Sequence, residues 1–337
     1  MKIAINGLGR IGRNFLRTIM LDPQAKRLLD VVAINVGPAD PKMAAHMFKY
    51  DTLMGTWNGQ VSAENGHLVI DNHTIRLLAF PDITKVDWGA LGVEWVVDCS
   101  GKFTQRDKAA IHIKQGAKKV LISAPCATAD AAIIPGVNDY AYNPAQDTIV
   151  SLGSCTTNAL LPLLKVVHDA FGIQKATMTT VHAYTNTQVL IDVERGDLRR
   201  SRAAALNIIP SSTGAVDMVD IVMPELAGKV TGIALRVPVA TVSLVDLVFV
   251  ANKEMTIASL NEKFSAAAQG SMSGIVNISM EPLVSSDYQK SPYSVVVDGL
   301  LTQAMGNFGQ LFGWYDNEWS YSVRLRDFLM RVATGEK

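Results

Sequence analysis

A glycine-rich turn between an apolar strand and a helix restricts the fold of this chain more than any other feature. Lys2-Ile3-Ala4-Ile5 has a strand pattern, Gly7-Leu8-Gly9-Arg10-Ile11-Gly12 follows it, and Arg13 to Leu21 is predicted to be a helix. In this context the glycines make a tight turn, admit a pyrophosphate close to the backbone and let the helix pack on the strand. The helix N-terminus then faces the anion. We therefore predict a dinucleotide-binding unit at the start of the chain.

The next predicted strand, Val31 to Asn35, lacks one usual part of such a site. An acidic residue about 20 positions after the glycines commonly binds the adenosine ribose, but Val36-Gly37-Pro38 stands there. The sequence supports a dinucleotide site without giving the usual reason to prefer NAD over NADP.

Further alternating units continue the same pattern as far as residue 150. Asp40-Pro41 is typical of a helix start, and Glu64-Asn65-Gly66 is typical of a hairpin turn. Strands are expected at Trp95 to Asp98, at Lys119 to Ile122 and at Thr148 to Val150. Ser100-Gly101 and Ser123 follow two of these strands, at the sheet edge where open α/β folds hold their ligands. A cofactor contact and a structural turn fit these residues equally well.

Beyond Gly172 the pattern changes to β-rich segments. The runs Thr177 to His182, Gly232 to Asn252 and Ser294 to Leu301 are interrupted by one helix, near Ile257 to Ala268. This change predicts a separate α+β domain. The last segment, Trp319 to Thr334, is amphipathic, so we expect a helix that packs on the first domain.

Composition excludes several classes of protein. The 337 residues include 31 Lys+Arg and 31 Asp+Glu, so the balanced charge gives no sign of nucleic acid or of a membrane surface as a partner. No apolar run reaches the length of a spanning helix, and we expect a cytoplasmic protein. Three cysteines without metal-ligand spacing predict neither a disulfide framework nor a metal site.

Cys155 lies where a β-rich segment gives way to a helical one, within Ser154-Cys155-Thr156-Thr157-Asn158. A thiol at a helix start is close to the positive end of the macrodipole, which favours the thiolate and lowers the pKa. We interpret Cys155 as a nucleophile, although a single cysteine is more often a small buried apolar residue.

A set of longer motifs then resembles one family, phosphorylating glyceraldehyde-3-phosphate dehydrogenase. The motifs span the chain and are Ile5 to Arg13, Ser154 to Asn158, His182-Ala183-Tyr184-Thr185, Asp197 to Arg200, Ser212 to Ala215, Arg236-Val237-Pro238 and Trp314 to Trp319. The resemblance implies an α/β fold, with an N-terminal Rossmann dinucleotide-binding domain and an α+β catalytic domain whose sheet is mainly antiparallel. It implies domain boundaries of 1–154 with 318–337, and 155–317, and a homotetramer.

The resemblance also implies the chemistry and its residues. Cys155 would attack the aldehyde of glyceraldehyde 3-phosphate and His182 would act as base. Thr185 and Arg236 would hold the substrate phosphate, and inorganic phosphate would be held by Ser154, Thr156, Arg200, Thr213 and Gly214. Asn317 would fix the nicotinamide carboxamide beside Tyr321, although Asn317 also fits a helix N-cap. The remaining cofactor contacts would be Gly7, Gly9, Arg10, Ile11, Gly12, Asn35, Val36, Ser100, Gly101, Ser123 and Glu194.

Two departures from the family pattern concern the cofactor. Val36 removes both a hydrogen-bond acceptor and a charge that would repel a 2′-phosphate, which favours NADP. Glu194 occupies a position where the family usually has proline, near the adenosine ribose by resemblance, and its carboxylate disfavours NADP. We expect NAD to be the cofactor, with weakened discrimination against NADP.

Two alternative functions are weighed against this one. The first is erythrose-4-phosphate dehydrogenase, a relative that releases the acid by hydrolysis; Thr185 and the Ser211 to Gly214 loop are similar to the phosphorolytic enzymes instead. The second is a dinucleotide-binding regulatory protein without catalysis, which is disfavoured because Cys155, His182, Arg200 and Arg236 are all present.

Overall fold

A computed structural model describes residues 1–335, which divide into two compact units. Unit 1 comprises residues 1–133 and 139–153 together with the segment that begins at Ser322. Unit 2 comprises residues 134–138 and 154–321. The last two residues of the predicted dinucleotide-binding domain, 336 and 337, lie outside the described part of the chain.

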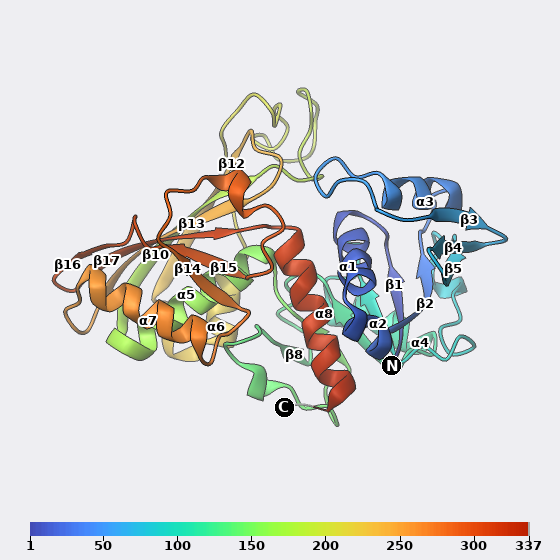
Figure 1. Cartoon of the computed structure of the whole chain (residues 1–337), viewed down its shortest axis with the longest axis horizontal. Coiled ribbons are helices and arrows are strands. Elements are labelled where there is room, and N and C mark those ends of the chain that lie inside the picture. The colour runs from blue at the N-terminus through green and yellow to red at the C-terminus, as the bar shows by residue number, and fades with distance from the viewer. Residues whose placement is uncertain (336–337) are drawn as a thin grey trace. The chain divides into compact units, whose positions relative to one another are not determined.

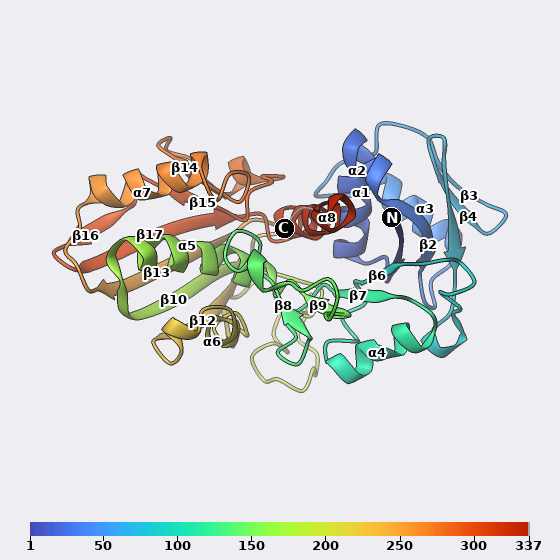
Figure 2. The same ribbon diagram turned by 90° about the horizontal axis from the view of Figure 1, so that it is seen from below.

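Unit 1 is built on a nine-stranded sheet with the strand order β3-β4-β5-β2-β1-β6-β7-β9-β8 (Figure 1). Its strands are β1 (Lys2–Asn6), β2 (Asp30–Asn35), β3 (Val61–Glu64), β4 (His67–Ile70), β5 (His73–Leu78), β6 (Trp95–Asp98), β7 (Lys119–Ile122), β8 (Ala131–Ala132) and β9 (Ile149–Ser151). Its helices are α1 (Arg10–Leu21), α2 (Pro23–Leu28), α3 (Pro41–Lys49), α4 (Arg106–Lys114) and the larger part of α8 (Trp319–Thr334). The β3-β4-β5 pairs are antiparallel and the other pairs are parallel. Figure 2 shows α4 on the opposite face of this sheet from α1.

Local chemistry explains these elements. Asp40 caps α3 by accepting from the Lys42 N–H, and Pro41 occupies the first turn. Asn65 and Gly66 both have positive φ, 49° and 76°, as the predicted two-residue hairpin requires. Helix α1 begins at Arg10, three residues before the predicted start, because the turn is completed by Gly7 (φ 96°) and Gly9 already serves as the N-cap.

Strand order defines where a ligand can approach unit 1. The chain runs from β1 outward to β2 on one side, while β6 pairs with β1 on the other side. Open parallel sheets bind ligands beyond the carboxyl ends of the strands at such a reversal. The carboxyl ends concerned here carry Asn6 and Asp98, which pair in register.

Unit 2 contains an eight-stranded sheet with the order β11-β12-β10-β13-β17-β15-β14, and β16 pairs with β17. The strands are β10 (Ile173–Ala183), β11 (Ile209–Ser211), β12 (Val230–Val237), β13 (Ser243–Ala251), β14 (Val276–Ser279), β15 (Val295–Asp298), β16 (Gln303–Met305) and β17 (Phe308–Tyr315). The helices are α5 (Cys155–Phe171), α6 (Asp217–Val222) and α7 (Ile257–Gln269). Only the β10–β12 and β14–β15 pairs are parallel. The predicted fold class, an α/β chain with a second, mainly antiparallel unit, is confirmed.

The apolar run Gly232 to Asn252 forms two strands rather than one continuous element. β12 ends at Val237, before Pro238, and Val242 takes a φ of 66° where the chain returns as β13. The burial pattern of β13 alternates strictly, so one face packs inward while the other remains partly accessible. Among residues 1–335, no helix is both long enough and apolar enough to cross a bilayer.

Candidate active site and dinucleotide pocket

The helix that carries the cysteine starts with a well-formed cap. The Ser154 hydroxyl accepts a hydrogen bond from the Thr157 N–H at 3.1 Å, and the Thr157 hydroxyl accepts one from the Ser154 N–H at 3.2 Å. This reciprocal capping box fixes Cys155 as the first residue of α5. The prediction of a cysteine at a helix start is confirmed, and the Ser154 hydroxyl is already engaged in the cap.

Strand β10 places His182 against this helix start. The Cys155 Sγ atom lies 3.6 Å from Nε2 of His182, whose side chain is buried. His182 Nδ1 lies 2.6 Å from the Ala183 carbonyl oxygen. An Nδ1–H that donates to this carbonyl leaves the Nε2 lone pair facing the thiol, which is the arrangement a general base needs.

The protonation states differ from the sequence-based expectation of a low thiol pKa. Burial raises the pKa of the Cys155 thiol, and this effect outweighs the lowering by the Arg236 charge, by the Thr156 hydroxyl and by backbone N–H groups at the helix start. The expectation of a lowered pKa is therefore wrong for this resting state. Burial, together with the Arg236 charge, lowers the pKa of His182 to about 3. The resting pair is a thiol beside a neutral imidazole.

Tyr315 is a neighbour of this pair that sequence reasoning missed. Its hydroxyl lies 3.0 Å from the Thr156 hydroxyl and 2.8 Å from the Thr180 hydroxyl, and all three groups are buried. The Tyr315 ring meets the His182 ring edge-on at 6.0 Å. These contacts hold the imidazole and the first turn of α5 in place. Tyr315 lies within the motif Trp314 to Trp319, but the motif assigned it no role.

Two arginines give the site its positive charge. Arg236 lies on β12 directly opposite His182 in the parallel ladder. Its Nη1 atom donates to the Ala183 carbonyl at 3.1 Å and lies 2.7 Å from His182 Nδ1. The second contact calls for a lone pair on Nδ1, whereas the Ala183 carbonyl calls for a proton there, so these two contacts do not fix the tautomer of His182. Burial lowers the pKa of Arg236, and the charge of the nearby Arg200 lowers it further. Paired guanidinium groups of this kind suit phosphate oxygens.

The other predicted phosphate ligands are placed as follows. Arg200 donates to the Ser211 hydroxyl at 2.8 Å through Nε, which fixes its guanidinium beside β11. The Thr185 hydroxyl pairs with that of Thr187, and the Thr213 hydroxyl accepts from the Ala215 N–H. Gly214 follows Thr213 in the same loop. Across residues 1–335, neither Thr185 nor Thr213 shares a hydrogen bond with Cys155 or His182.

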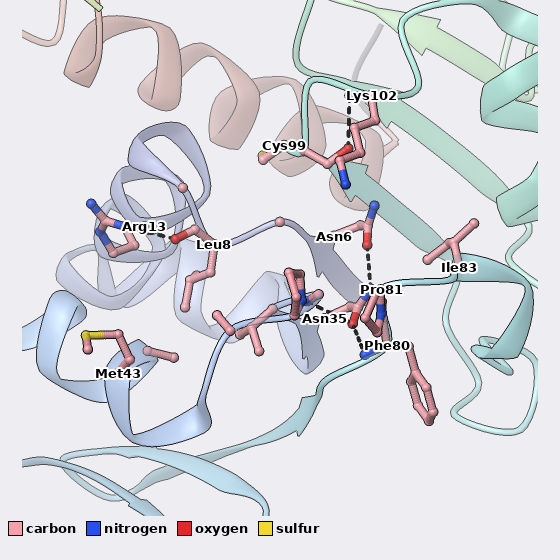
Figure 3. A pocket seen from close by; sticks show the side chains of 18 of the residues that line it. Asn6, Leu8, Arg13, Asn35, Met43, Phe80, Pro81, Ile83, Cys99 and Lys102 are labelled. Carbon is pink, nitrogen blue, oxygen red and sulfur yellow. Dashed lines mark hydrogen bonds between the residues drawn. The ribbon is translucent and has the colours of Figure 1, made fainter. Parts of the chain in front are cut away.

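A second site lies at the reversal of strand order in unit 1, as a pocket of about 350 Å³ (Figure 3). Five predicted cofactor residues line it: Gly7, Gly9, Asn35, Val36 and Ser100. The predicted residues Arg10, Ile11, Gly12, Gly101 and Ser123 do not line it. Arg10 instead forms an ion pair with Asp51, and Gly12 packs against Gly7, whose carbonyl oxygen would lie 2.1 Å from an added Cβ.

The pocket suits a dinucleotide. No side chain within residues 1–335 caps α1 at Gly9, so the helix start offers its dipole and N–H groups to an anion. A Cβ added at Gly9 would meet no protein atom within 4 Å, so the backbone there is open to a ligand. Phe80, Phe103 and Met43 supply apolar walls that sequence reasoning missed. Within the described residues, the pocket lining contains no Asp or Glu, and it contains the basic residues Arg13 and Lys102.

Three predicted cofactor residues, Asn317, Tyr321 and Glu194, belong to unit 2. The Asn317 side-chain oxygen accepts from the Ser243 hydroxyl at 3.1 Å, and that hydroxyl accepts from the N–H of Ala183, next to His182. The alternative role of Asn317 as an N-cap is wrong, because the Asp316 carboxylate accepts from the N–H groups of Glu318 and Trp319. Tyr321 is buried and Glu194 is exposed.

These features define a protein with a dinucleotide-binding unit and a second unit that carries a cysteine–histidine pair with two arginines. Models of two domains match the chain: "Glyceraldehyde 3-phosphate dehydrogenase, NAD binding domain" over residues 1–106 and "Glyceraldehyde 3-phosphate dehydrogenase, C-terminal domain" over residues 154–317. The chain belongs to the glyceraldehyde-3-phosphate dehydrogenase family.

Curated relatives agree over almost the full length. The chain is 46% identical to glyceraldehyde-3-phosphate dehydrogenase 1 of Bacillus subtilis, over 99% of this chain and 98% of the relative. It is 44% identical, with the same coverage, to glyceraldehyde-3-phosphate dehydrogenase of Geobacillus stearothermophilus. It is 45% identical, again with that coverage, to the plasmid-encoded enzyme of that name in Cupriavidus necator.

Proposed function

We propose that this protein catalyses the NAD-dependent, phosphorylating oxidation of glyceraldehyde 3-phosphate to 1,3-bisphosphoglycerate. The observation that carries the proposal is the 3.6 Å approach of Cys155 Sγ to His182 Nε2, in a chain that belongs to this family. The family supplies the substrate class, and the geometry supports Cys155 as the nucleophile and His182 as its base.

The first half of the reaction forms a thioester. Cys155 Sγ attacks the aldehyde carbon as its proton passes by way of His182 Nε2 to the carbonyl oxygen, which gives a thiohemiacetal. His182 Nε2 then removes the hydroxyl proton, while the hydride leaves the same carbon and the carbonyl forms again. NAD, when bound, accepts that hydride. Burial and the Arg236 charge hold the pKa of His182 at about 3, so the imidazole is neutral at pH 7 and its Nε2 lone pair is available, while so low a pKa makes the resting imidazole a weak base.

The second half releases the acyl group to phosphate. A phosphate oxygen attacks the thioester carbon, the C–S bond breaks, and the leaving sulfur takes the proton from His182. In our assignment Thr185 and Arg236 hold the substrate phosphate, and Ser154, Thr156, Arg200, Thr213 and Gly214 hold inorganic phosphate. The Arg236 charge next to the thiol, and the Arg200 charge near Arg236, support this assignment. N–H groups at the start of α5 are suited to stabilising the developing oxyanion.

Cofactor preference follows from the pocket lining. The buried side chain of Val36 stands at the pocket wall after β2, and the described lining has no carboxylate to repel a 2′-phosphate. We expect NAD to be used with weak discrimination against NADP. Glu194 does not line this pocket.

We also propose a homotetramer. The segment from residue 190 to residue 208 exposes Leu190, Ile191, Leu198, Leu206 and Ile208, and Leu198 is 93% exposed. Apolar side chains gathered in this way are typical of surfaces buried by another subunit. A cytoplasmic location is consistent with three cysteines that are all unpaired.

A pre-steady-state assay tests the proposed function. Mixing enzyme, NAD and glyceraldehyde 3-phosphate without phosphate is expected to give one NADH per active site, followed by a stop that phosphate or arsenate releases. Cys155→Ser is expected to abolish both phases. Continued turnover without phosphate, or a preference for erythrose 4-phosphate, would favour the hydrolytic relative instead. Absence of any burst from a protein that binds dinucleotide would favour the regulatory alternative.

A further inference from the structure

A hydrogen-bonded network of buried polar side chains extends from the wall of the dinucleotide pocket to residues outside the pocket. Its members come from β1, β2, β6, α4 and the loop before β6, and they are Asn6, Asn35, Asp98, His112 and Trp88. Asn6 and Asn35 line the pocket, whereas Asp98, His112 and Trp88 do not. His112 is fully buried and the Asp98 side chain is 2% exposed.

Four hydrogen bonds connect these side chains, and the donors of each arm point toward Asp98. Trp88 Nε1 donates to His112 Nδ1 at 3.2 Å, and His112 Nε2 donates to Asp98 Oδ2 at 3.0 Å. Asn35 Nδ2 donates to Asn6 Oδ1 at 2.9 Å, and Asn6 Nδ2 donates to the same Asp98 Oδ2 at 2.7 Å. Both arms therefore converge on one carboxylate.

The chemistry of the indole fixes the tautomer of His112. An indole N–H can only donate, so His112 Nδ1 must accept and the proton of the neutral imidazole must lie on Nε2. That proton points at Asp98. The Trp88 contact thus commits His112 to be a donor to the carboxylate.

The carboxylate and Asn35 shape two parts of the pocket wall. The other Asp98 oxygen accepts from the Ser100 N–H at 3.1 Å and from the Ser100 hydroxyl at 2.8 Å. Asn35 accepts from the Phe80 N–H at 3.0 Å and donates to the Phe80 carbonyl at 3.1 Å (Figure 3). The Ser100 turn packs tightly against Gly7: a Cβ added at Gly7 would lie 2.8 Å from Ser100 N. Movement of that turn therefore displaces the glycine loop.

We propose that His112 is a positioning residue for the bound dinucleotide, acting through Asp98 on Asn6 and on the Ser100 turn. The bond between Asn6 and Asp98 joins β1 to β6 at the reversal of strand order, where the ligand is expected. The inference rests on the proposed function only for the identity of the ligand as NAD.

A matched pair of variants tests this role. In His112→Asn the amide oxygen can replace Nδ1 as the acceptor for Trp88, but the donor to Asp98 is lost. In His112→Gln the longer amide can present its nitrogen near the position of Nε2 and keep the donor to Asp98. Both variants remove the ring from a fully buried site, so both are expected to lower the melting temperature.

The readouts are ADP-ribose binding by calorimetry, KM for NAD, and kcat at saturating NAD. We expect His112→Asn to weaken ADP-ribose binding about tenfold and to raise KM for NAD in parallel, with kcat within about twofold, a size that matches the loss of one hydrogen bond to a charged group. We expect His112→Gln to bind ADP-ribose within about threefold of the wild type.

Equal weakening by the two variants, in proportion to their melting temperatures, would show a purely structural role and overturn the proposal. The isosteric Asp98→Asn provides a second test if a His112 variant fails to fold; normal ADP-ribose binding by that variant would also refute the inference. ADP-ribose binding requires no aldehyde chemistry. A protein that passes these tests but does not oxidise glyceraldehyde 3-phosphate would refute the proposed function alone.

Discussion

Asp130→Asn is expected to destabilise the protein at neutral pH and to lose this effect in acid. The Asp130 side chain is 16% exposed and forms an ion pair with Arg106. Its Oδ2 atom also accepts from the Thr148 N–H and hydroxyl and from the Ile149 N–H, at 2.8 to 3.0 Å. These bonds anchor the start of β9, the strand that precedes the Cys155 segment in the chain.

The magnitude follows from the pKa of Asp130. Burial alone would raise that pKa, but the hydrogen bonds from Arg106, Thr148 and Ile149 outweigh burial and lower it from 3.8 to about 2. A carboxylate with a depressed folded-state pKa stabilises the fold above its unfolded pKa, and this stability is lost as pH falls through the folded pKa. The full shift corresponds to about 2.4 kcal/mol. Because Arg106 is 45% exposed, screening reduces our expectation to about 1 to 2 kcal/mol.

Urea unfolding of the wild type and of Asp130→Asn at pH 7 and pH 3 measures this contribution. The difference in free energy of unfolding is expected to be about 1 to 2 kcal/mol at pH 7 and about half as large at pH 3. Asp169→Asn removes a carboxylate from an exposed ion pair with Lys165 and serves as the control, with an expected effect below about 0.5 kcal/mol. A difference that is absent at pH 7, or undiminished at pH 3, would refute the reasoning.

Three further predictions concern activity and assembly. His182→Asn is expected to lower kcat by about 10² to 10⁴, because a general base contributes that much. ADP-ribose binding should stay unchanged, because His182 does not line the pocket of unit 1. A kcat within tenfold of the wild type would contradict the role of base. Val36→Asp is expected to lower kcat/KM for NADP more than about 30-fold, since the new carboxylate and the 2′-phosphate, as unit charges about 6 Å apart at an effective dielectric constant of 20, repel by about 3 kcal/mol. The uncharged Val36→Asn should change kcat/KM for NADP less than about threefold. Equal effects of the two variants would refute the electrostatic explanation. Leu198→Asp is expected to dissociate the tetramer in light-scattering measurements, whereas Leu21→Asp on α1, where the side chain is 60% exposed, should not; an intact tetramer in the first variant would exclude Leu198 from the interface.

The sequence predicts those parts of the fold whose signals are local. The glycines after β1, the Asp40-Pro41 start of α3 and the Asn65-Gly66 turn each specify their own backbone conformation, and the structure confirms them. The start of α1 was misplaced because the same glycines both turn the chain and cap the helix. The alternative role of Asn317 as N-cap before α8 is wrong because Asp316, one residue earlier, offers the same chemistry.

The non-local parts of the two sites could not be predicted in this way. Tyr315 meets Thr156 across 159 residues of chain, and Asn35 meets Phe80 across 45. No spacing rule relates such pairs, since their contact depends on strand order and register. His112 is a further example: it lies in α4 with no motif around it, and its role appears only when β6 brings Asp98 to its Nε2 atom.

The same distinction explains the nucleophile. Position at a helix start lowers the pKa of the Cys155 thiol, as the sequence suggests, but burial outweighs that effect. The thiol cannot then rely on a resting thiolate, and its activation depends on transfer of its proton at the moment of attack. His182 is placed for this transfer because it is neutral at rest and its Nε2 atom faces Sγ, and a proton on Nδ1 that is donated to the Ala183 carbonyl leaves the Nε2 lone pair available. Reactivity in this site therefore resides in the contact between α5 and β10 rather than in either element alone.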